Sequence, residues 1–160
     1  MEKVLRRINS SESARLSLKI ISHGASLILA LAFFYELLVF ILNGAYTAAL
    51  EIAAFSAAGY AAVSIFRALL NAPRPYELYD FYTVPPKNKK GSSFPSRHTY
   101  SAFVIATLAH LINPFISVAL YALGAVIAIA RVLLGIHFIR DVAAGAILGI
   151  LAGVMGLLLI

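Results

Sequence analysis

The chain has 160 residues, of which 61% are hydrophobic and only 12% charged, and its formal net charge is +6. Soluble domains contain about 45–50% apolar and about 25% charged residues. The composition therefore excludes an ordinary soluble or disordered chain and indicates an integral membrane protein, with residues 1–160 forming one membrane-embedded domain. Cysteine is absent, which excludes disulfides and thiol nucleophiles. The basic balance favours the lipid bilayer and its anionic headgroups as partners, and no nucleic acid is expected.

Residues 1–19 are predicted to lie at the membrane surface. They interleave basic with apolar side chains, namely Lys3, Arg6 and Arg7 with Val4, Leu5 and Ile8. This pattern is typical of an amphipathic segment in the interface between headgroups and acyl chains.

Five apolar stretches follow, at about residues 20–42, 46–70, 99–112, 115–135 and 142–160. A helix needs about 20 apolar residues to cross a membrane. The third stretch is short by that measure, so it either extends into the loop before it or sits partly within the bundle. The sequence predicts an all-α, polytopic transmembrane helical bundle of about five spans, preceded by the amphipathic segment.

The long polar stretch at residues 71–98 separates the second and third apolar stretches. It is rich in residues that interrupt helices and in lysine: Pro73, Pro75, Pro85, Pro86, Lys87, Lys89 and Lys90. A long loop in a small membrane protein is often functional, so we expect this one to contribute to the site.

Three glycines of the last apolar stretch share one helix face, because Gly145, Gly149 and Gly153 are spaced by four. Small residues at this spacing let a second backbone approach closely. The sequence leaves two interpretations open, which are packing within the chain and a homodimer through this face.

The 13 Lys and Arg residues fall in three regions: before the first span, between the second and third, and around the turn between the fourth and fifth. Five spans place these regions on one membrane face. The positive-inside rule then favours a cytoplasmic basic face in a multi-pass protein of the plasma membrane. Part of this charge bias could instead reflect a site for an anionic substrate, which is itself basic. The N-terminal cations lie outside the candidate site, so their position still favours a cytoplasmic basic face.

Side chains suited to phosphate chemistry occur in the same regions. They are Arg67, Arg74, Ser96, Arg97, His98, Arg131, His137 and Asp141. Arginine binds phosphate oxygens in a bidentate manner and stabilises the extra charge of a phosphoryl transition state. His137 and Asp141 are four residues apart, so a helical turn puts them side by side, and a carboxylate that accepts one ring N–H raises the basicity of the other nitrogen. This suits a histidine nucleophile, with His98 as general acid.

These residues resemble the signature of the type 2 phosphatidic acid phosphatase (PAP2) superfamily, which reads Lys-x6-Arg-Pro, Pro-Ser-x-His and Ser-Arg-x5-His-x3-Asp. The three parts appear in order as Arg67 through Arg74-Pro75, as Pro95-Ser96-Arg97-His98, and as Ala130-Arg131 through His137 and Asp141. Arg67 stands where the family usually has Lys, and Ala130 stands where it usually has Ser, so that hydroxyl contact is absent.

The resemblance implies an integral membrane lipid phosphatase that works without a metal or other cofactor. In the family the third-motif histidine is the phosphorylated nucleophile, which falls on His137, the aspartate that orients it on Asp141, and the acid on His98. The phosphate ligands fall on four further residues, Arg67, Arg74, Ser96 and Arg131. Arg97 is an auxiliary candidate, and residues 71–98 form the active-site loop.

The expected substrate is a phosphomonoester or pyrophosphate on a membrane lipid. Candidates are phosphatidylglycerophosphate, phosphatidic acid, an undecaprenyl pyrophosphate-type carrier and phosphorylated lipid A. A lipid phosphotransferase remains an alternative within enzymes, and a non-catalytic phosphate or lipid transporter is an alternative of another class. The histidine pair with its carboxylate argues against a transporter, because phosphate binding alone does not need it.

The carboxylates bear on metal binding and on the first span. Glu77, Asp80 and Asp141 lie amid many cations, which makes a poor Mg²⁺ site and predicts no metal. Glu36 lies in the middle of the first span, where a carboxylate is a functional candidate by default. The sequence leaves open whether Glu36 hydrogen-bonds to a neighbour in its neutral form or lines a substrate groove.

Overall fold

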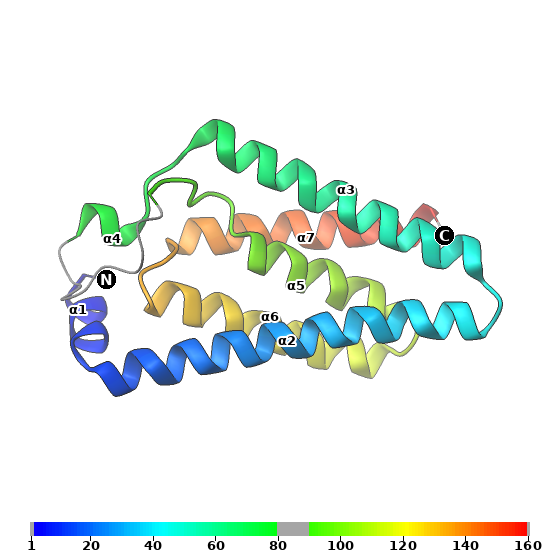
Figure 1. Cartoon of the computed structure of the whole chain (residues 1–160), viewed down its shortest axis with the longest axis horizontal. Coiled ribbons are helices and arrows are strands. Elements are labelled where there is room, and N and C mark those ends of the chain that lie inside the picture. The colour runs from blue at the N-terminus through cyan, green and yellow to red at the C-terminus, as the bar shows by residue number, and fades with distance from the viewer. Residues whose placement is uncertain (1, 80–89, 160) are drawn as a thin grey trace.

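A computed structural model describes residues 2–79 and 90–159 of the chain, and within these ranges it contains helices and no strand. The elements are α1 (Glu2–Ser10), α2 (Glu12–Leu42), α3 (Tyr46–Leu70), α4 (Pro75–Leu78), α5 (Arg97–Leu108), the 3-10 helix η1 (Ala109–Leu111), α6 (Pro114–Leu133) and α7 (Ile139–Leu159) (Figure 1). The predicted all-α bundle is thus confirmed.

Among the described residues, four segments are long and apolar enough to cross a membrane: Glu12–Leu42, Tyr46–Leu78, Pro114–Leu133 and Ile139–Leu159. Their outward faces carry large apolar side chains, as at Leu50 (70% exposed), Leu69 (79%) and Phe115 (86%). Such surfaces would be unfavourable in water, and in a bilayer they face the acyl chains.

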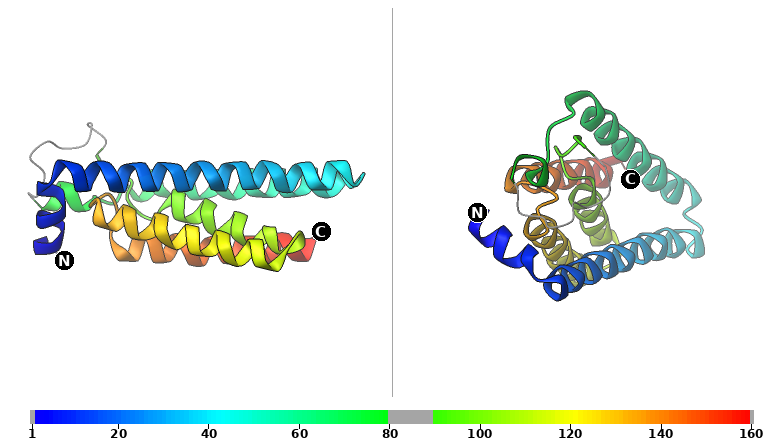
Figure 2. Two further views of the ribbon diagram at one scale, coloured as in Figure 1. Left: turned by 90° about the horizontal axis from the view of Figure 1, so that it is seen from below. Right: turned by 60° about the vertical axis from the view of Figure 1, so that its left-hand side comes forward.

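The third apolar stretch is the helix α5, which has 12 residues and is continued by η1. It lies at the centre of the bundle, among α2, α3, α6 and α7 (Figures 1 and 2). Tyr100, Ala102, Val104, Ala106 and Leu108 are all buried there. Of the two alternatives for this short stretch, the structure therefore shows the one within the bundle.

The first spanning helix begins earlier than its hydropathy indicates. α2 starts at Glu12 because Ser11 caps it, with the Ser11 hydroxyl accepting a hydrogen bond from the Ala14 backbone N–H at 3.4 Å. The segment expected at the interface over residues 1–19 is consequently divided between α1 and the first turns of α2.

The glycine face of α7 packs against α5 within the chain. A Cβ atom added at Gly145 would lie 2.6 Å from the Ser96 carbonyl oxygen, and one at Gly149 would lie 2.6 Å from the Tyr100 carbonyl oxygen. The face is thus occupied by α5, as the intramolecular interpretation expected, and is not open to a second copy of the chain.

The helices alternate in direction, so that distant segments meet at one end of the bundle. α1, α4, the start of α5 and the α6–α7 turn share this polar end, while the α2–α3 turn lies at the other (Figure 1). The basic regions predicted to share a face therefore do so within the described residues. The expected loop over residues 71–98 lies partly outside them, since residues 80–89 are not described, and His98 belongs to the first turn of α5.

Glu36 is 3% exposed on α2, and neither of its carboxyl oxygens has a hydrogen-bond partner among the described residues. The hydrogen bond to a neighbour, one of the two interpretations of this residue, is therefore not formed.

Candidate functional site

The polar end of the bundle gathers the eight residues selected from the sequence, and each is placed by the end of a helix. Arg67 is in the last turn of α3, Arg74 precedes α4, Ser96 caps α5, Arg97 and His98 begin α5, Arg131 is in the last turn of α6, His137 lies between α6 and α7, and Asp141 is in the first turn of α7. Helix ends hold side chains rigidly while leaving one side open to a ligand.

Arg67 fastens the segment before α5 to α3. Its Nη1 donates to the Pro95 carbonyl at 2.5 Å and to the Ser93 carbonyl at 3.4 Å, and its Nη2 donates to the Ser92 carbonyl. The guanidinium is 5% exposed. Much of its donor capacity thus goes to the backbone, so this residue positions the loop at least as much as it can bind an anion.

Arg74 and Glu77 hold Gly91 from both sides. The Arg74 Nε donates to the Gly91 carbonyl at 2.9 Å, and the Gly91 backbone N–H donates to the Glu77 Oε1 at 2.7 Å. Gly91 has a φ of 69°, and a Cβ atom there would collide with the side chain of Asn71. A glycine is required at this point, and the Arg74 guanidinium also lies over the Tyr76 ring, 5.8 Å from its centroid.

Ser96 and Arg97 both have partners within the chain. The Ser96 hydroxyl accepts from the Thr99 hydroxyl at 3.1 Å and from the Thr99 backbone N–H at 3.5 Å, as a helix cap does. The Arg97 guanidinium donates to the Ser64 hydroxyl at 3.3 Å and stacks over the Tyr60 ring at 5.4 Å, both on α3. Arg97 is therefore held by α3.

Arg131 is 8% exposed, and its Nε has no hydrogen-bond partner among the described residues. An unpaired guanidinium N–H in a buried position is costly unless a ligand satisfies it. This donor is the clearest anion-binding group of the site.

His137, Asp141 and Ser93 form a buried group of three. The His137 Nδ1 lies 3.6 Å from the Asp141 Oδ2, and the Ser93 hydroxyl lies between them. Ser93 donates to the Asp141 Oδ2 at 2.5 Å and is 3.4 Å from the His137 Nδ1. The Phe138 backbone N–H also donates to the Asp141 Oδ2, at 2.9 Å. The spacing of four does bring imidazole and carboxylate together, but a serine that was not singled out from the sequence mediates their contact.

The surroundings of His137 keep its imidazole neutral. Burial lowers the pKa of His137, Asp141 raises it, and the positive charges of Arg74 and Arg67 lower it, so that the net pKa falls below the ordinary 6.5. A neutral imidazole with a proton on Nδ1, directed towards Asp141 and Ser93, presents a free electron pair on Nε2.

His98 belongs to the same electrostatic environment. Burial lowers the pKa of His98 to about 3, and the positive charge of Arg131 contributes to the lowering. His98 and His137 thus both lie at the polar end, in the first turn of α5 and in the turn before α7.

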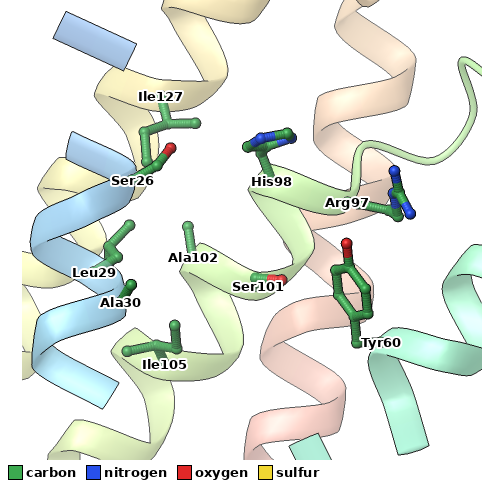
Figure 3. Close-up of a pocket in the computed structure, with 10 residues that line it drawn as sticks. All are labelled: Ser26, Leu29, Ala30, Tyr60, Arg97, His98, Ser101, Ala102, Ile105 and Ile127. Carbon is green, nitrogen blue, oxygen red and sulfur yellow. The ribbon is translucent and has the colours of Figure 1, made fainter. Parts of the chain in front are cut away.

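A cavity of about 230 Å³ opens beside His98 (Figure 3). Arg97 and His98 form its polar rim, and Leu29, Ala102 and Ile127 are among the apolar residues that line it. The polar groups thus border a space suited to hydrocarbon.

The described residues offer little to a metal ion. No group of three or more His, Cys, Asp or Glu side chains that could hold one occurs in residues 2–79 and 90–159. The donors of the site are cationic or neutral, which suits an anion.

Fold and site together indicate an integral membrane protein whose polar end is rich in arginine and histidine side chains. The chain belongs to the PAP2 superfamily, because the sequence model of that family matches residues 45–160. The resemblance read from the three motifs is thereby confirmed.

Individual proteins are also similar to this chain. It is 39% identical over 82 residues to the lipid A 1-phosphatase of Porphyromonas gingivalis, a match that covers 49% of this chain and 18% of that protein, so the chain spans less than a fifth of the relative's length. The crystal structure of Aquifex aeolicus LpxE superimposes with a TM-score of 0.72 and 25% identity, covering 97% of this chain and 93% of that one. A transmembrane PAP2-type phosphatidylglycerolphosphate phosphatase from Bacillus subtilis superimposes with a TM-score of 0.74 and 20% identity, covering 99% and 83%, and shows the fold alone.

Proposed function

We propose that this protein is a metal-independent phosphatase of membrane lipids that works through a phosphohistidine. The observation that carries the proposal is the buried group of His137, Asp141 and Ser93 in one site with His98 and the unpaired Arg131 Nε. A phosphate-binding transporter needs the arginine but not a neutral imidazole backed by a carboxylate.

In the first step, the His137 Nε2 attacks the phosphorus atom and the bond to the lipid oxygen breaks in line with it. Arg131 and Arg74 stabilise the negative charge of the equatorial oxygens. The carboxylate of Asp141 stabilises the positive charge that develops on the imidazole.

His98 gives its proton to the departing lipid oxygen. In the free site the low pKa of His98 favours the neutral ring. A bound phosphate brings negative charge among the arginines, which raises this pKa and charges His98 when the substrate arrives. In the second step, neutral His98 accepts a proton from water, and the hydroxide oxygen displaces phosphate from His137.

The cavity beside His98 supports a lipid as substrate. It lies between the site and apolar side chains of α2 and α6, so a phosphate at the polar end would place its hydrocarbon chain within the bundle (Figure 3). A chain entering sideways from the bilayer reaches this cavity without crossing water.

The identity of the lipid substrate depends on which membrane face the site occupies. The relative from Porphyromonas gingivalis favours phosphorylated lipid A or a similar lipid. The charge distribution favours a cytoplasmic site in the plasma membrane, which suits phosphatidylglycerophosphate or phosphatidic acid. A panel of these lipids with undecaprenyl pyrophosphate decides among them.

The decisive experiment measures phosphate release from that panel by the purified protein in lipid nanodiscs containing EDTA. We expect release from at least one lipid, inhibition by vanadate, and a labelled phosphoenzyme on quenching in alkaline detergent, which preserves the acid-labile bond between phosphorus and the histidine nitrogen. His137→Ala should lose turnover by at least about a thousandfold, because the nucleophile is gone. Substrate binding without turnover in the intact protein would refute the proposed phosphatase activity.

A matched variant is His110→Ala, which removes an imidazole from η1 at the other end of the bundle. It should retain turnover close to that of the unmodified protein. If His137→Ala retains turnover too, the assigned nucleophile is wrong even where phosphatase activity is real.

A further inference from the structure

The N-terminal helix α1 is docked on the polar end of the bundle, where it contacts α2 and α6. It runs across the polar end of the bundle, whereas α2, α3, α6 and α7 run along its length (Figure 2). With the long axis of the bundle along the membrane normal, α1 lies in the plane of the membrane surface. One of its faces is buried, with Leu5 at 2% exposure and Asn9 at 0%.

Asn9 completes the C-terminus of α6. The last carbonyls of a helix lack partners within it and need donors from elsewhere. Three of them accept backbone N–H groups from the α6–α7 turn, at Ala130, Arg131 and Val132. The next carbonyl, of Leu133, accepts the side-chain Nδ2 of Asn9 at 2.9 Å, and the same Nδ2 donates to the Leu5 carbonyl at 2.8 Å.

The turn that Asn9 caps connects two of the site residues, Arg131 and His137. The Arg131 carbonyl accepts the backbone N–H groups of Ile136 at 3.1 Å and of His137 at 3.3 Å, so the two site residues are joined through one turn of backbone. Gly135 has a φ of 65°, which lets the chain reverse there. Any motion of α1 that breaks the bond to Leu133 releases the end of this turn.

The opposite face of α1 is built for an anionic surface. Lys3 and Arg7 are exposed, Val4 is 54% exposed, and the start of α2 adds the exposed Lys19 and the half-buried Arg15. Over residues 1–19 the acidic groups are Glu2 and Glu12, against five basic ones. The excess of cations lies where lipid headgroups lie, and attraction to anionic lipid presses α1 against the bundle.

We propose that α1 is a sensor of anionic lipid headgroups. The hydrogen bond from the Asn9 side chain to the Leu133 carbonyl transmits their binding to the turn that positions Arg131 and His137. Asn9 is a positioning residue, since it acts through the Leu133 carbonyl. The effect on turnover rests on the proposed function, whereas the ordering of the turn does not.

The test is hydrogen exchange of backbone amides in nanodiscs of phosphatidylcholine, with and without phosphatidylglycerol. Phosphatidylglycerol should slow exchange in residues 133–137 of the unmodified protein by about fivefold, the factor contributed by one hydrogen bond of ordinary net strength. Lys3→Gln with Arg7→Gln should remove this response while leaving exchange in phosphatidylcholine unchanged, because neither side chain is packed. Asn9→Asp keeps the shape but loses the donor, and should exchange fast in both membranes.

The control removes the same charge elsewhere, with Lys87→Gln and Lys90→Gln between α4 and α5 in the sequence. This variant should keep the response. Equal exchange with and without phosphatidylglycerol in the unmodified protein, or an intact response in the Lys3 and Arg7 variant, would overturn the proposal. Should Asn9→Asp fail to fold, the Lys3 and Arg7 variant decides alone.

Turnover provides the second measurement. Phosphatidylglycerol should raise kcat about fivefold with little change in KM, and the Lys3 and Arg7 variant should lose this gain. If no lipid is hydrolysed at all while the exchange response is present, the proposed function fails and the sensor stands. If lipid is hydrolysed and exchange is insensitive to phosphatidylglycerol, the sensor fails alone.

Discussion

Three donor groups surround the Asp141 Oδ2, and their competition for this oxygen sets the basicity of His137. Ser93 takes the shortest bond, at 2.5 Å, Phe138 follows at 2.9 Å, and the imidazole stands at 3.6 Å. A carboxylate already occupied by a hydroxyl stabilises a neighbouring imidazolium less than a free one does. Ser93 therefore helps to keep His137 neutral and nucleophilic.

Ser93→Ala tests this competition. Without the hydroxyl, the charge of Asp141 falls more fully on His137 and stabilises the imidazolium, so the pKa of His137 rises from its depressed value. Activity requires the neutral ring and is lost as pH falls through this pKa. The acid limb of kcat/KM should therefore move to higher pH, by roughly half to one unit, as expected for one hydrogen bond.

Ser117→Ala is the matched control for that measurement. Ser117 is also buried, and its hydroxyl donates to the Ala106 carbonyl at 2.6 Å, away from the site. It should leave the pH profile in place even if it lowers stability. An acid limb that stays fixed in Ser93→Ala would show that the serine does not tune His137.

The sequence predicts a contact between two site residues when they are close along the chain. The interval between His137 and Asp141 predicts that they lie close together, and they do, although His137 lies in the turn before α7 and not on a helix. Ser93 is 44 residues from His137 in the chain, and only the folding of the segment held by Arg67 brings its hydroxyl to the site. No local pattern predicts such a contact.

Among the elements, the seam between α5 and α7 holds the site together. α5 carries Ser96 and His98, α7 carries Asp141, and the Ser96 backbone N–H donates to the Asp141 carbonyl at 2.9 Å. The glycines of α7 allow the two backbones to approach closely enough for this bond.

Gly149→Ala should destabilise the protein and lower its activity. The new Cβ would lie 2.6 Å from the Tyr100 carbonyl oxygen and 2.9 Å from the Phe103 Cβ, and backbone cannot yield as a flexible side chain does. Overpacking of this kind costs about 1–3 kcal/mol. Thermal unfolding in detergent should show a lower Tm, and kcat should fall because α5 shifts relative to α7.

Gly24→Ala makes the same chemical change where there is room. Gly24 lies on the exposed side of α2, and nothing lies within 4 Å of its added Cβ. This variant should match or exceed the Tm of the unmodified protein, because alanine favours the helix. Equal Tm values for the two variants would show that the seam tolerates a methyl group.

The sequence predicts where a helix begins and ends when a change in polarity coincides with residues that favour a turn. The second span was expected at residues 46–70 and is the helix Tyr46–Leu70, set between a turn at Gly44 and a left-handed Asn71. α2 begins before the first apolar residue of its span, because the cap at Ser11 acts on residues that are still polar. The short α5 needs no full crossing, since its neighbours cover it on several sides.

Across the whole molecule, charge is divided between the two ends of the bundle. The polar end carries the exposed cations of α1 and α2, together with Lys90 and Arg140, while the turn at residues 43–45 between α2 and α3 has none. Because cytoplasmic segments near spanning helices are enriched in Lys and Arg, we expect the polar end to face the cytoplasm.

Single cysteines test this orientation directly, because the chain has no thiol of its own. Lys90 and Asn43 are exposed at opposite ends of the bundle. In intact cells an impermeant maleimide should label Asn43→Cys and spare Lys90→Cys, and both should be labelled once the membrane is opened, which is the control for reactivity. Labelling of Lys90→Cys from outside would reverse the orientation. The site would then face lipids of the outer surface, and phosphorylated lipid A or a polyprenyl pyrophosphate would become the better substrate.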